Sequence, residues 1–150
     1  MVINEYGSRD NPTIVLLAPM MVSGTDLYEL IKPYFKGSYH VVAPDQGGHG
    51  KAGAYISADE EYRALRSFLL GNNCTEIALV YGASLGVAVA WRLFFDPAFH
   101  VAHITGIMNK RKRAGTAFIA VPAHGCVRIV RAEAVIEGIG YGSIISASCF

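Results

Sequence analysis

Short apolar runs alternate along the first hundred residues with segments whose apolar positions recur at helical spacing. Residues 13–17 and 76–81 are nearly continuous apolar runs, which is typical of strands buried inside a parallel sheet. Tyr62, Leu65 and Phe68 instead follow the spacing of an amphipathic helix. The predicted strands are residues 13–17, 40–44, 76–81 and 101–107, and the predicted helices are residues 25–31, 57–71 and 87–95.

The alternation of strands and helices predicts the fold class. Strands that are separated by helices pack as parallel neighbours joined by right-handed crossovers. Strand and helix alternate three times before residue 97, so the sequence predicts an α/β fold with a mostly parallel sheet and helices on both faces. Residues 101–107 are expected to add a fourth parallel strand.

Polar residues mark the predicted helix ends. Ser23 or Thr25 is expected to cap the first helix, and Lys36 with Gly37 is expected to end it. Ser57, which is followed by acidic residues, is typical of a capped start for the second helix.

The turn between the third strand and the third helix carries the pattern Gly-x-Ser-x-Gly at residues 82–86. A chain that passes from strand to helix within about two residues holds its central residue in a strained, exposed conformation. Gly82 and Gly86 remove side chains that would otherwise collide at such a turn. Ser84 is therefore the candidate nucleophile, and the alternative is a glycine-rich turn that only packs the helix on the sheet.

Composition predicts one domain with two unlike parts. The chain has 150 residues, of which 52% are hydrophobic, and its formal net charge of +1 indicates no polyanionic partner. Up to Thr105 the chain has seven Lys and Arg and ten Asp and Glu, whereas from Gly106 onward it has six Lys and Arg and two Asp and Glu. We therefore expect an N-terminal part, residues 1–107, and a divergent C-terminal segment, residues 108–150.

Cysteines and apolar runs give an expectation about compartment and cofactors. Cys74, Cys126 and Cys149 are odd in number and widely spaced, which favours neither a disulfide framework nor paired metal ligands. The N-terminal residues lack the pattern of a leader peptide, and no run reaches the ~18 apolar residues of a membrane span. The glycine-rich residues 47–50 lack the Lys-Ser/Thr of a phosphate loop. We expect a cytoplasmic protein with no membrane association, metal or organic cofactor.

Three segments resemble the α/β-hydrolase superfamily. They are the strand and loop at residues 16–20, the sequence Pro-Asp-Gln-Gly-Gly-His-Gly at residues 44–50, and the turn at Ser84. They occur in the family's order and at about its spacing, so the resemblance covers roughly two thirds of the chain. It implies an incomplete α/β-hydrolase fold with a nucleophile elbow.

The resemblance also implies an activity. Similar enzymes are serine hydrolases, so we expect this chain to act on a small-molecule ester, thioester or amide through an acyl-Ser84 intermediate. The N–H of Leu85 lies at the start of the predicted helix, where it has no intrahelical partner and can hold an oxyanion. In similar enzymes the second donor follows the first strand, which points to the N–H of Met20.

The loop around Met20 departs from the family's pattern. Similar enzymes usually carry His-Gly where this chain has Ala18 and Pro19, and a proline stiffens the loop and removes a donor. The side chains of Met20 and Met21 have two interpretations, which are apolar packing under the helix and lining of a pocket.

The resemblance further implies a triad in which an acidic residue and then a histidine follow the serine. Asp96 is the only carboxylate in that order, but it ends the helix that leaves Ser84, roughly 15 Å away and beyond hydrogen-bond reach. His124 lies in a loop between two apolar runs and is the candidate base, with an ordinary turn histidine as the alternative. The other carboxylates and histidines after Ser84 are Glu133, Glu137, His100 and His103.

Two further polar residues are expected to be structural. In similar proteins the Gly-His-Gly segment ties its loop to the surroundings, so we do not assign catalysis to His49. Asp45 is interpreted as a loop or helix-cap carboxylate, because short acidic side chains satisfy backbone donors at turns.

The resemblance is lost from Asn109 onward. Residues 117–121 and 126–130 are apolar runs around a short turn, a pattern typical of a hairpin. The basic cluster at residues 110–113 is more typical of a solvated loop than of a nucleic-acid site, so no nucleic-acid partner is expected. We predict a truncated or frame-disrupted hydrolase that self-associates through an exposed sheet edge. The alternative is a non-catalytic α/β-hydrolase-like module that binds a small ligand or a partner.

Overall fold

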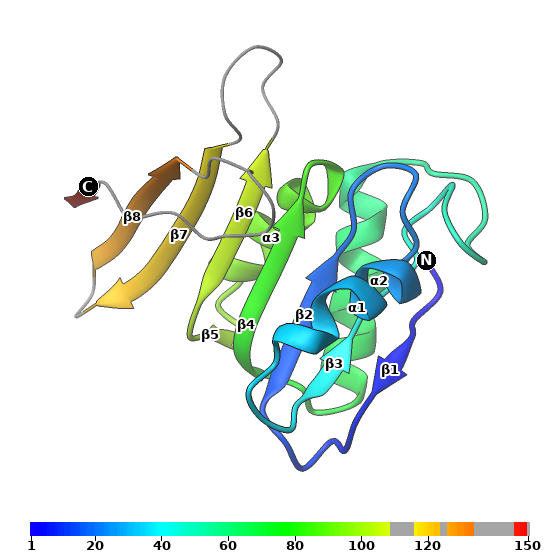
Figure 1. Ribbon diagram of the computed structural model, residues 1–150. Coiled ribbons are helices and arrows are strands. Elements are labelled where there is room, and N and C mark those ends of the chain that lie inside the picture. The colour runs from blue at the N-terminus through cyan, green and yellow to red at the C-terminus, as the bar shows by residue number, and fades with distance from the viewer. Residues whose placement is uncertain (109–115, 124–125, 134–145, 150) are drawn as a thin grey trace.

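A computed structural model describes the backbone of residues 1–108, 116–123, 126–133 and 146–149, and the side chains up to Gly106. The described strands form one nine-stranded sheet, and three α-helices pack against it (Figure 1). In chain order, the elements are β1 (Glu5–Tyr6), β2 (Thr13–Leu17), α1 (Gly24–Ile31), the 3-10 helix η1 (Lys32–Tyr34), β3 (His40–Val42), α2 (Ala58–Gly71), β4 (Glu76–Ala83), α3 (Leu85–Phe95), β5 (His100–Val101), β6 (Ile104–Met108), β7 (Thr116–Ala123), β8 (Cys126–Glu133) and β9 (Ser146–Cys149).

The centre of the sheet is parallel. The strand order is β1-β3-β2-β4-β6-β7-β8-β9, and β5 pairs with the beginning of β4. Strands β3, β2, β4 and β6 run parallel to one another, as the sequence predicts. Antiparallel strands extend this centre on both sides, with β1 against β3 and β7 against β6. The parallel strands end at the upper edge of the sheet in Figure 1, and the loops that follow β2, β3 and β4 begin there.

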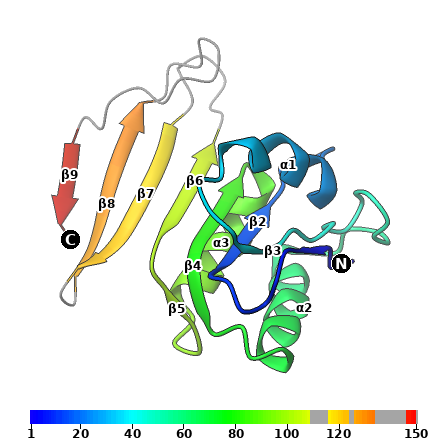
Figure 2. The ribbon, with the colours of Figure 1, turned by 60° about the horizontal axis from the view of Figure 1, so that its bottom comes forward.

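Two apolar layers cover the faces of the sheet, because α1 packs on one face and α2 with α3 on the other (Figures 1 and 2). β2 serves both layers: Ile14 and Leu16 lie in the cluster with Leu27 of α1, whereas Val15 and Leu17 lie in the larger cluster under α2 and α3. All five residues of β2 are buried for this reason, which explains its unbroken apolar sequence.

The helix starts agree with the sequence, whereas the predicted end of the first helix is wrong. Ser23 caps α1 in a capping box with Asp26, and Ser57 caps α2. The α-helical part of α1 stops at Ile31, not at residues 36–37. Pro33 explains this early end, since its ring collides with the preceding turn and it lacks an N–H for an α-helical hydrogen bond.

Two strands also differ from the prediction. β1 has only two residues and carries no apolar run, so its pairing with β3 was not visible in the sequence. The predicted strand at residues 101–107 is divided into β5 and β6, although the two residues between them stay bonded to β4. The N–H of Ala102 donates to the carbonyl oxygen of Ile77, and the carbonyl oxygen of His103 accepts from the N–H of Val80.

Beyond β6 the described chain forms only strands. β7 and β8, which contain the two runs predicted to form a hairpin, pair antiparallel, and β9 pairs antiparallel with β8. In Figures 1 and 2, the helices of the described chain lie beside β2, β4 and β6 and away from β7 and β8. Whether residues 108–150 act as a separate unit stays a prediction. None of the helices in the described ranges is long and apolar enough to cross a bilayer.

Candidate active site

Ser84 lies at a sharp turn between β4, which ends at Ala83, and α3, which begins at Leu85. Its backbone has φ of 47° and ψ of −105°, in the left-handed half of the dihedral map that costs a residue with a Cβ about 1–3 kcal/mol. Ser84 is exposed, and its hydroxyl makes no capping hydrogen bond to the first turn of α3. The turn therefore holds a serine hydroxyl accessible to solvent at the end of the central strand.

Two glycines permit this turn. A Cβ on Gly82 would lie 2.9 Å from the Cβ of Ala90 and 3.0 Å from the carbonyl oxygen of Gly86. A Cβ on Gly86 would lie only 2.3 Å from the carbonyl oxygen of Leu17, which is backbone and cannot rotate away. Both glycines are thus required by close packing of α3 against β4 and β2, as the Gly-x-Ser-x-Gly pattern predicts.

The first turn of α3 supplies backbone donors beside Ser84. Leu85 is the first helical residue, and the first N–H groups of a helix have no intrahelical acceptor. The helix dipole also favours negative charge at this end. The position of Leu85 is therefore compatible with the predicted oxyanion donor.

The loop after β2 lies next to this turn. β2 and β4 are paired in parallel, with Leu17 opposite Gly82, so the two chains leave the sheet side by side. The N–H of Val22 donates to the carbonyl oxygen of Pro19 at 3.3 Å, which closes a turn centred on Met20 and Met21. Met20 is 64% exposed and Met21 is 89% exposed. Packing under the helix, the alternative interpretation of these methionines, is therefore wrong.

Gln46, in the loop after β3, holds the start of the loop after β2 in place. Its Nε2 donates to the carbonyl oxygen of Ala18 at 2.7 Å, and its side chain is almost completely buried. The neighbouring N–H of Gly47 donates to Glu61 of α2 at 2.9 Å. Gln46 thus positions the start of the loop that carries Met20. A single polar residue in a glycine-rich loop gives no sequence signal for this role.

Asp45 is the centre of the loop after β3. Its Oδ1 accepts from the N–H of Gly24, the first residue of α1, at 2.8 Å and from the amide of Asn4 at 3.1 Å. Its Oδ2 accepts from the N–H of Lys51 at 2.9 Å. His49 donates from Nδ1 to the carbonyl oxygen of Gly47 at 2.8 Å, within its own loop. These contacts confirm the interpretation of Asp45 as a carboxylate that satisfies backbone donors at a loop and a helix start, whereas the contact of His49 stays within its own loop.

Comparisons with known proteins place this geometry among characterised folds. No protein-family model and no curated protein sequence matches the chain. A protein of the α/β hydrolase family from Desulfitobacterium hafniense matches it with a TM-score of 0.61 and 20% identity, over 68% of this chain and 42% of its own. A marine microorganism esterase gives a TM-score of 0.59 and 19% identity, over 69% and 40%. An esterase from Exiguobacterium antarcticum gives 0.55 and 15%, over 67% and 38%.

This chain has an α/β-hydrolase fold. The predicted resemblance and fold class are thereby confirmed over about two thirds of the chain. The chain spans about two fifths of the length of these solved structures.

Asp96 lies at the far end of α3 from Ser84 in this hydrolase fold. Its carboxylate accepts hydrogen bonds from the hydroxyl of Tyr62, from Nε of Arg66 at 2.6 Å and from the N–H of Ala98 at 2.9 Å. Burial opposes ionisation of the carboxyl, but these hydrogen bonds and the positive charge of Arg66 outweigh it and lower the pKa of Asp96. Asp96 therefore joins α2 to the end of α3 and is not available to a triad.

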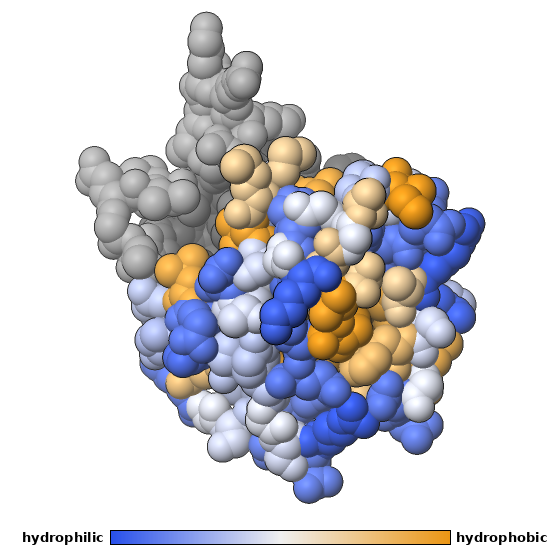
Figure 3. Space-filling view, turned by 90° about the vertical axis from the view of Figure 1, so that its right-hand side faces the viewer, coloured by the Kyte–Doolittle hydropathy of each residue, from blue (hydrophilic) through white to orange (hydrophobic). Residues whose placement is uncertain are grey.

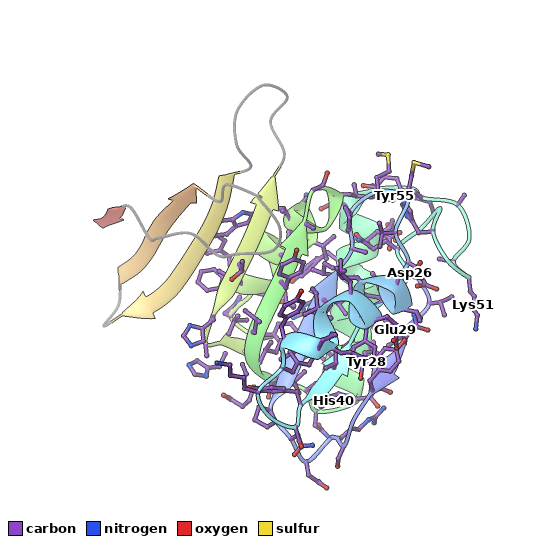
Figure 4. The ribbon with its side chains drawn as sticks, viewed as in Figure 1. Asp26, Tyr28, Glu29, His40, Lys51 and Tyr55 are labelled. Atoms are coloured by element: carbon purple, nitrogen blue, oxygen red, sulfur yellow. The ribbon has the colours of Figure 1, made fainter. Side chains whose placement is uncertain are left out.

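Three of the four described histidines, His40, His100 and His103, lie away from the end of β4 that carries Ser84. His40 is buried between Glu5 and Thr13 near the beginning of the parallel strands, as Figure 4 shows. His100 pairs with Glu76 at 2.8 Å, and His103 directly precedes β6, both away from the end of β4. His124 and Glu137 lie outside the described residues, and the side chain of Glu133 is also outside them.

The other sites to consider are a metal centre, a groove between α2 and α3, and the basic cluster. Among the described residues, no group of three or more His, Cys, Asp or Glu side chains could hold a metal ion. An open groove lies between α2 and α3, but Ser84 does not line it, and its arginines 66 and 92 pair with Asp96 and Asp59. The basic cluster at residues 110–113 lies outside the described residues.

Proposed function

We propose that this chain carries the nucleophile and oxyanion-binding part of a serine hydrolase that acts on a small-molecule ester, thioester or amide. The observation that supports this most directly is the backbone of Ser84, whose positive φ is maintained at an exposed turn. Such a conformation persists only where packing enforces it, and here Gly82 and Gly86 allow that packing. The solved esterases that share the fold are consistent with the same reaction class.

The proposed chemistry begins at Oγ of Ser84, which would attack the carbonyl carbon of the substrate as a general base takes its proton. The N–H groups of Leu85 and Met20 would stabilise the negative charge that develops on the carbonyl oxygen. Collapse of this intermediate expels the protonated alcohol, thiol or amine and leaves an acyl-Ser84 ester. Water then attacks the ester, regenerates Ser84 and releases the acid.

The general base of this reaction would be a histidine that follows Ser84 in the chain. His124 stays the predicted base, and it lies outside the described residues. A second candidate function is supported by the placement of the described histidines, since His40, His100 and His103 lie away from Ser84 and His49 is bonded within its own loop. In that case the chain is a non-catalytic module that binds a small ligand at the same edge of the sheet.

Labelling with an alkyl fluorophosphonate distinguishes the two functions, because only an activated serine displaces fluoride from the reagent and becomes phosphonylated. We expect intact-mass spectrometry to show one adduct, and peptide mapping to place it on Ser84. Ser84→Ala should abolish the adduct, whereas Ser67→Ala, which removes an exposed serine from α2, should keep it. An unlabelled wild-type protein with a native circular dichroism spectrum would favour the binding module.

A further inference from the structure

Exposed apolar side chains are concentrated in the two loops that follow β2 and β3. Of the side chains that the structure describes, seven large hydrophobic ones are exposed. Met20 and Met21 lie in the loop after β2, and Tyr55 and Ile56, exposed by 39% and 77%, lie in the loop after β3. The remaining three are Leu30, Tyr34 and Phe95. Among the side chains up to Gly106, more than half of the exposed large apolar ones therefore belong to the two loops that follow β2 and β3.

These two loops contact each other. Gln46 bonds to the carbonyl oxygen of Ala18, which joins the start of the second loop to the start of the first. The chain at Tyr55 then returns against Gly47, where an added Cβ would lie 2.5 Å from the Cα of Tyr55. Figure 4 shows Tyr55 at the edge where β2 and β4 end, and Lys51 of the same loop pointing outward. Figure 3 shows apolar residues at the upper edge of this side of the molecule and a further apolar area in the middle of the same face.

Met21 has a backbone conformation that glycine adopts with less strain. Its φ of 68° is left-handed, and the hydrogen bond from Val22 to Pro19 makes it the third residue of a tight turn, where glycine is the usual choice. A methionine there is strained and also exposes its apolar side chain to water. Neither cost is offset by packing inside the described fold, so a bound ligand is the partner that would compensate for it.

We propose that Met20, Met21, Tyr55 and Ile56 form the apolar surface that holds the aliphatic chain of the substrate, so that the preferred substrate is an ester with a long aliphatic chain. This inference rests on the proposed function of Ser84. The parallel pairing of Leu17 with Gly82 places the methionine loop directly beside the nucleophile. A chain bound to the serine can lie across Met20 and Met21 and continue toward Tyr55 and Ile56. Methionine side chains are flexible and polarisable, which suits them to contact chains of variable length.

Two fluorophosphonates with the same reactive group test this inference, one with a decyl chain and one with an ethyl chain. We expect the decyl reagent to label Ser84 at least about tenfold faster, because a few methylenes buried against apolar side chains account for such a ratio. Met21→Ser and Ile56→Ser should each lower the decyl-to-ethyl ratio several-fold. Leu30→Ser, which removes an exposed apolar side chain from α1, should leave the ratio unchanged. Equal rates for both reagents on the wild-type protein would overturn the inference.

A second measurement does not require a reactive serine. In Ser84→Ala protein labelled with carbon-13 at the methionine methyl groups, decanoate should shift the resonances of Met20 and Met21, butyrate should not, and Met1 serves as the internal reference. If neither reagent labels Ser84 but decanoate shifts these methyl groups, the proposed reaction at Ser84 is wrong, whereas the proposed binding of an aliphatic chain by the apolar surface is supported. If the methyl groups respond only to phosphatidylcholine vesicles and not to decanoate, the surface binds a lipid bilayer and the inference is wrong.

Discussion

The Cα of Gly86 lies against the carbonyl oxygen of Leu17, so closely that an added Cβ would stand 2.3 Å from this oxygen. Gly86 belongs to the first turn of α3, and Leu17 is the last residue of β2. This single contact joins the two segments that carry the proposed oxyanion donors, Leu85 and Met20. The distance between the two donors therefore depends on a residue that has no side chain.

Replacement of Gly86 by alanine tests this contact. Because the obstructing atom is backbone, Gly86→Ala should force α3 away from β2 and lower the free energy of unfolding by about 1–3 kcal/mol. It should also slow labelling of Ser84. Gly71→Ala is the matched control, since nothing lies within 4 Å of its added Cβ, and it should be neutral or stabilising by up to about 1 kcal/mol. Urea denaturation measures both, and equal effects would contradict the role of Gly86.

Met21→Gly is expected to separate stability from substrate preference. Relief of a left-handed φ, worth about 1–2 kcal/mol, exceeds the entropy that glycine adds to the unfolded chain, so the variant should gain roughly 0.5–1 kcal/mol. Its decyl-to-ethyl labelling ratio should nevertheless fall. Met20→Gly, whose residue has no positive φ, should not be stabilised. A destabilised Met21→Gly would show that the methionine side chain packs within the fold.

Asp96 should be far more important for stability than Asp59, although both carboxylates pair with an arginine across α2 and α3. The side chain of Asp96 is 7% exposed, and its removal leaves Tyr62, Arg66 and the N–H of Ala98 without their acceptor. Asp96→Ala should lower the free energy of unfolding by about 2–3 kcal/mol. Asp59→Ala breaks an exposed pair and should cost about 0.5 kcal/mol or less. Similar denaturation midpoints for the two variants would refute this difference.

Acid should destabilise the protein through Glu5 and Asp96. Hydrogen bonds from Arg9 and His40 lower the pKa of Glu5 from its ordinary 4.5, despite partial burial, and the pKa of Asp96 lies below its ordinary 3.8. Lowered folded-state pKa values add stability that is fully present above the ordinary values and is lost as the pH falls through the folded ones. Stability should thus decline below about pH 4.5. The double variant Glu5→Gln/Asp96→Asn should flatten this decline in urea midpoints measured from neutral to acid pH.

His40 should be a structural residue, unlike His100. The imidazole of His40 is 1% exposed, with Nε2 2.9 Å from Glu5 and Nδ1 3.2 Å from the hydroxyl of Thr13, so it links β1, β3 and β2. His40→Ala creates a cavity and removes the hydrogen-bond partner of Thr13 and one of the partners of Glu5, which should cost about 2–4 kcal/mol. His100→Ala removes an exposed imidazole and should change stability by about 0.5 kcal/mol or less. Thermal unfolding of both variants provides the comparison, and an unaffected His40→Ala would disprove the link.

Local patterns predicted much of the fold because their causes are local. The apolar run of β2 has the observed bounds, and Ser23 and Ser57 cap their helices as expected, since a capping side chain bonds within its own turn. The two residues of β1 were missed because only pairing with β3 makes them a strand. The end of α1 was misjudged, although Pro33 was present in the sequence as a stop signal.

The candidate site shows the same difference between features with local causes, which the sequence predicted, and features that depend on long-range contacts. Gly-x-Ser-x-Gly between a strand and a helix located Ser84 from the sequence by itself, because the glycines and the serine belong to one turn. The sequence left Met20 and Met21 open between packing under the helix and lining a pocket, and only the tertiary structure showed that both side chains are exposed. The hydrogen bond from Gln46 to Ala18 and the link from Asp96 to Arg66 span 28 and 30 residues. Such contacts depend on which loops and helix ends the sheet brings together, and that is settled by long-range strand pairing, which no local pattern in the chain records.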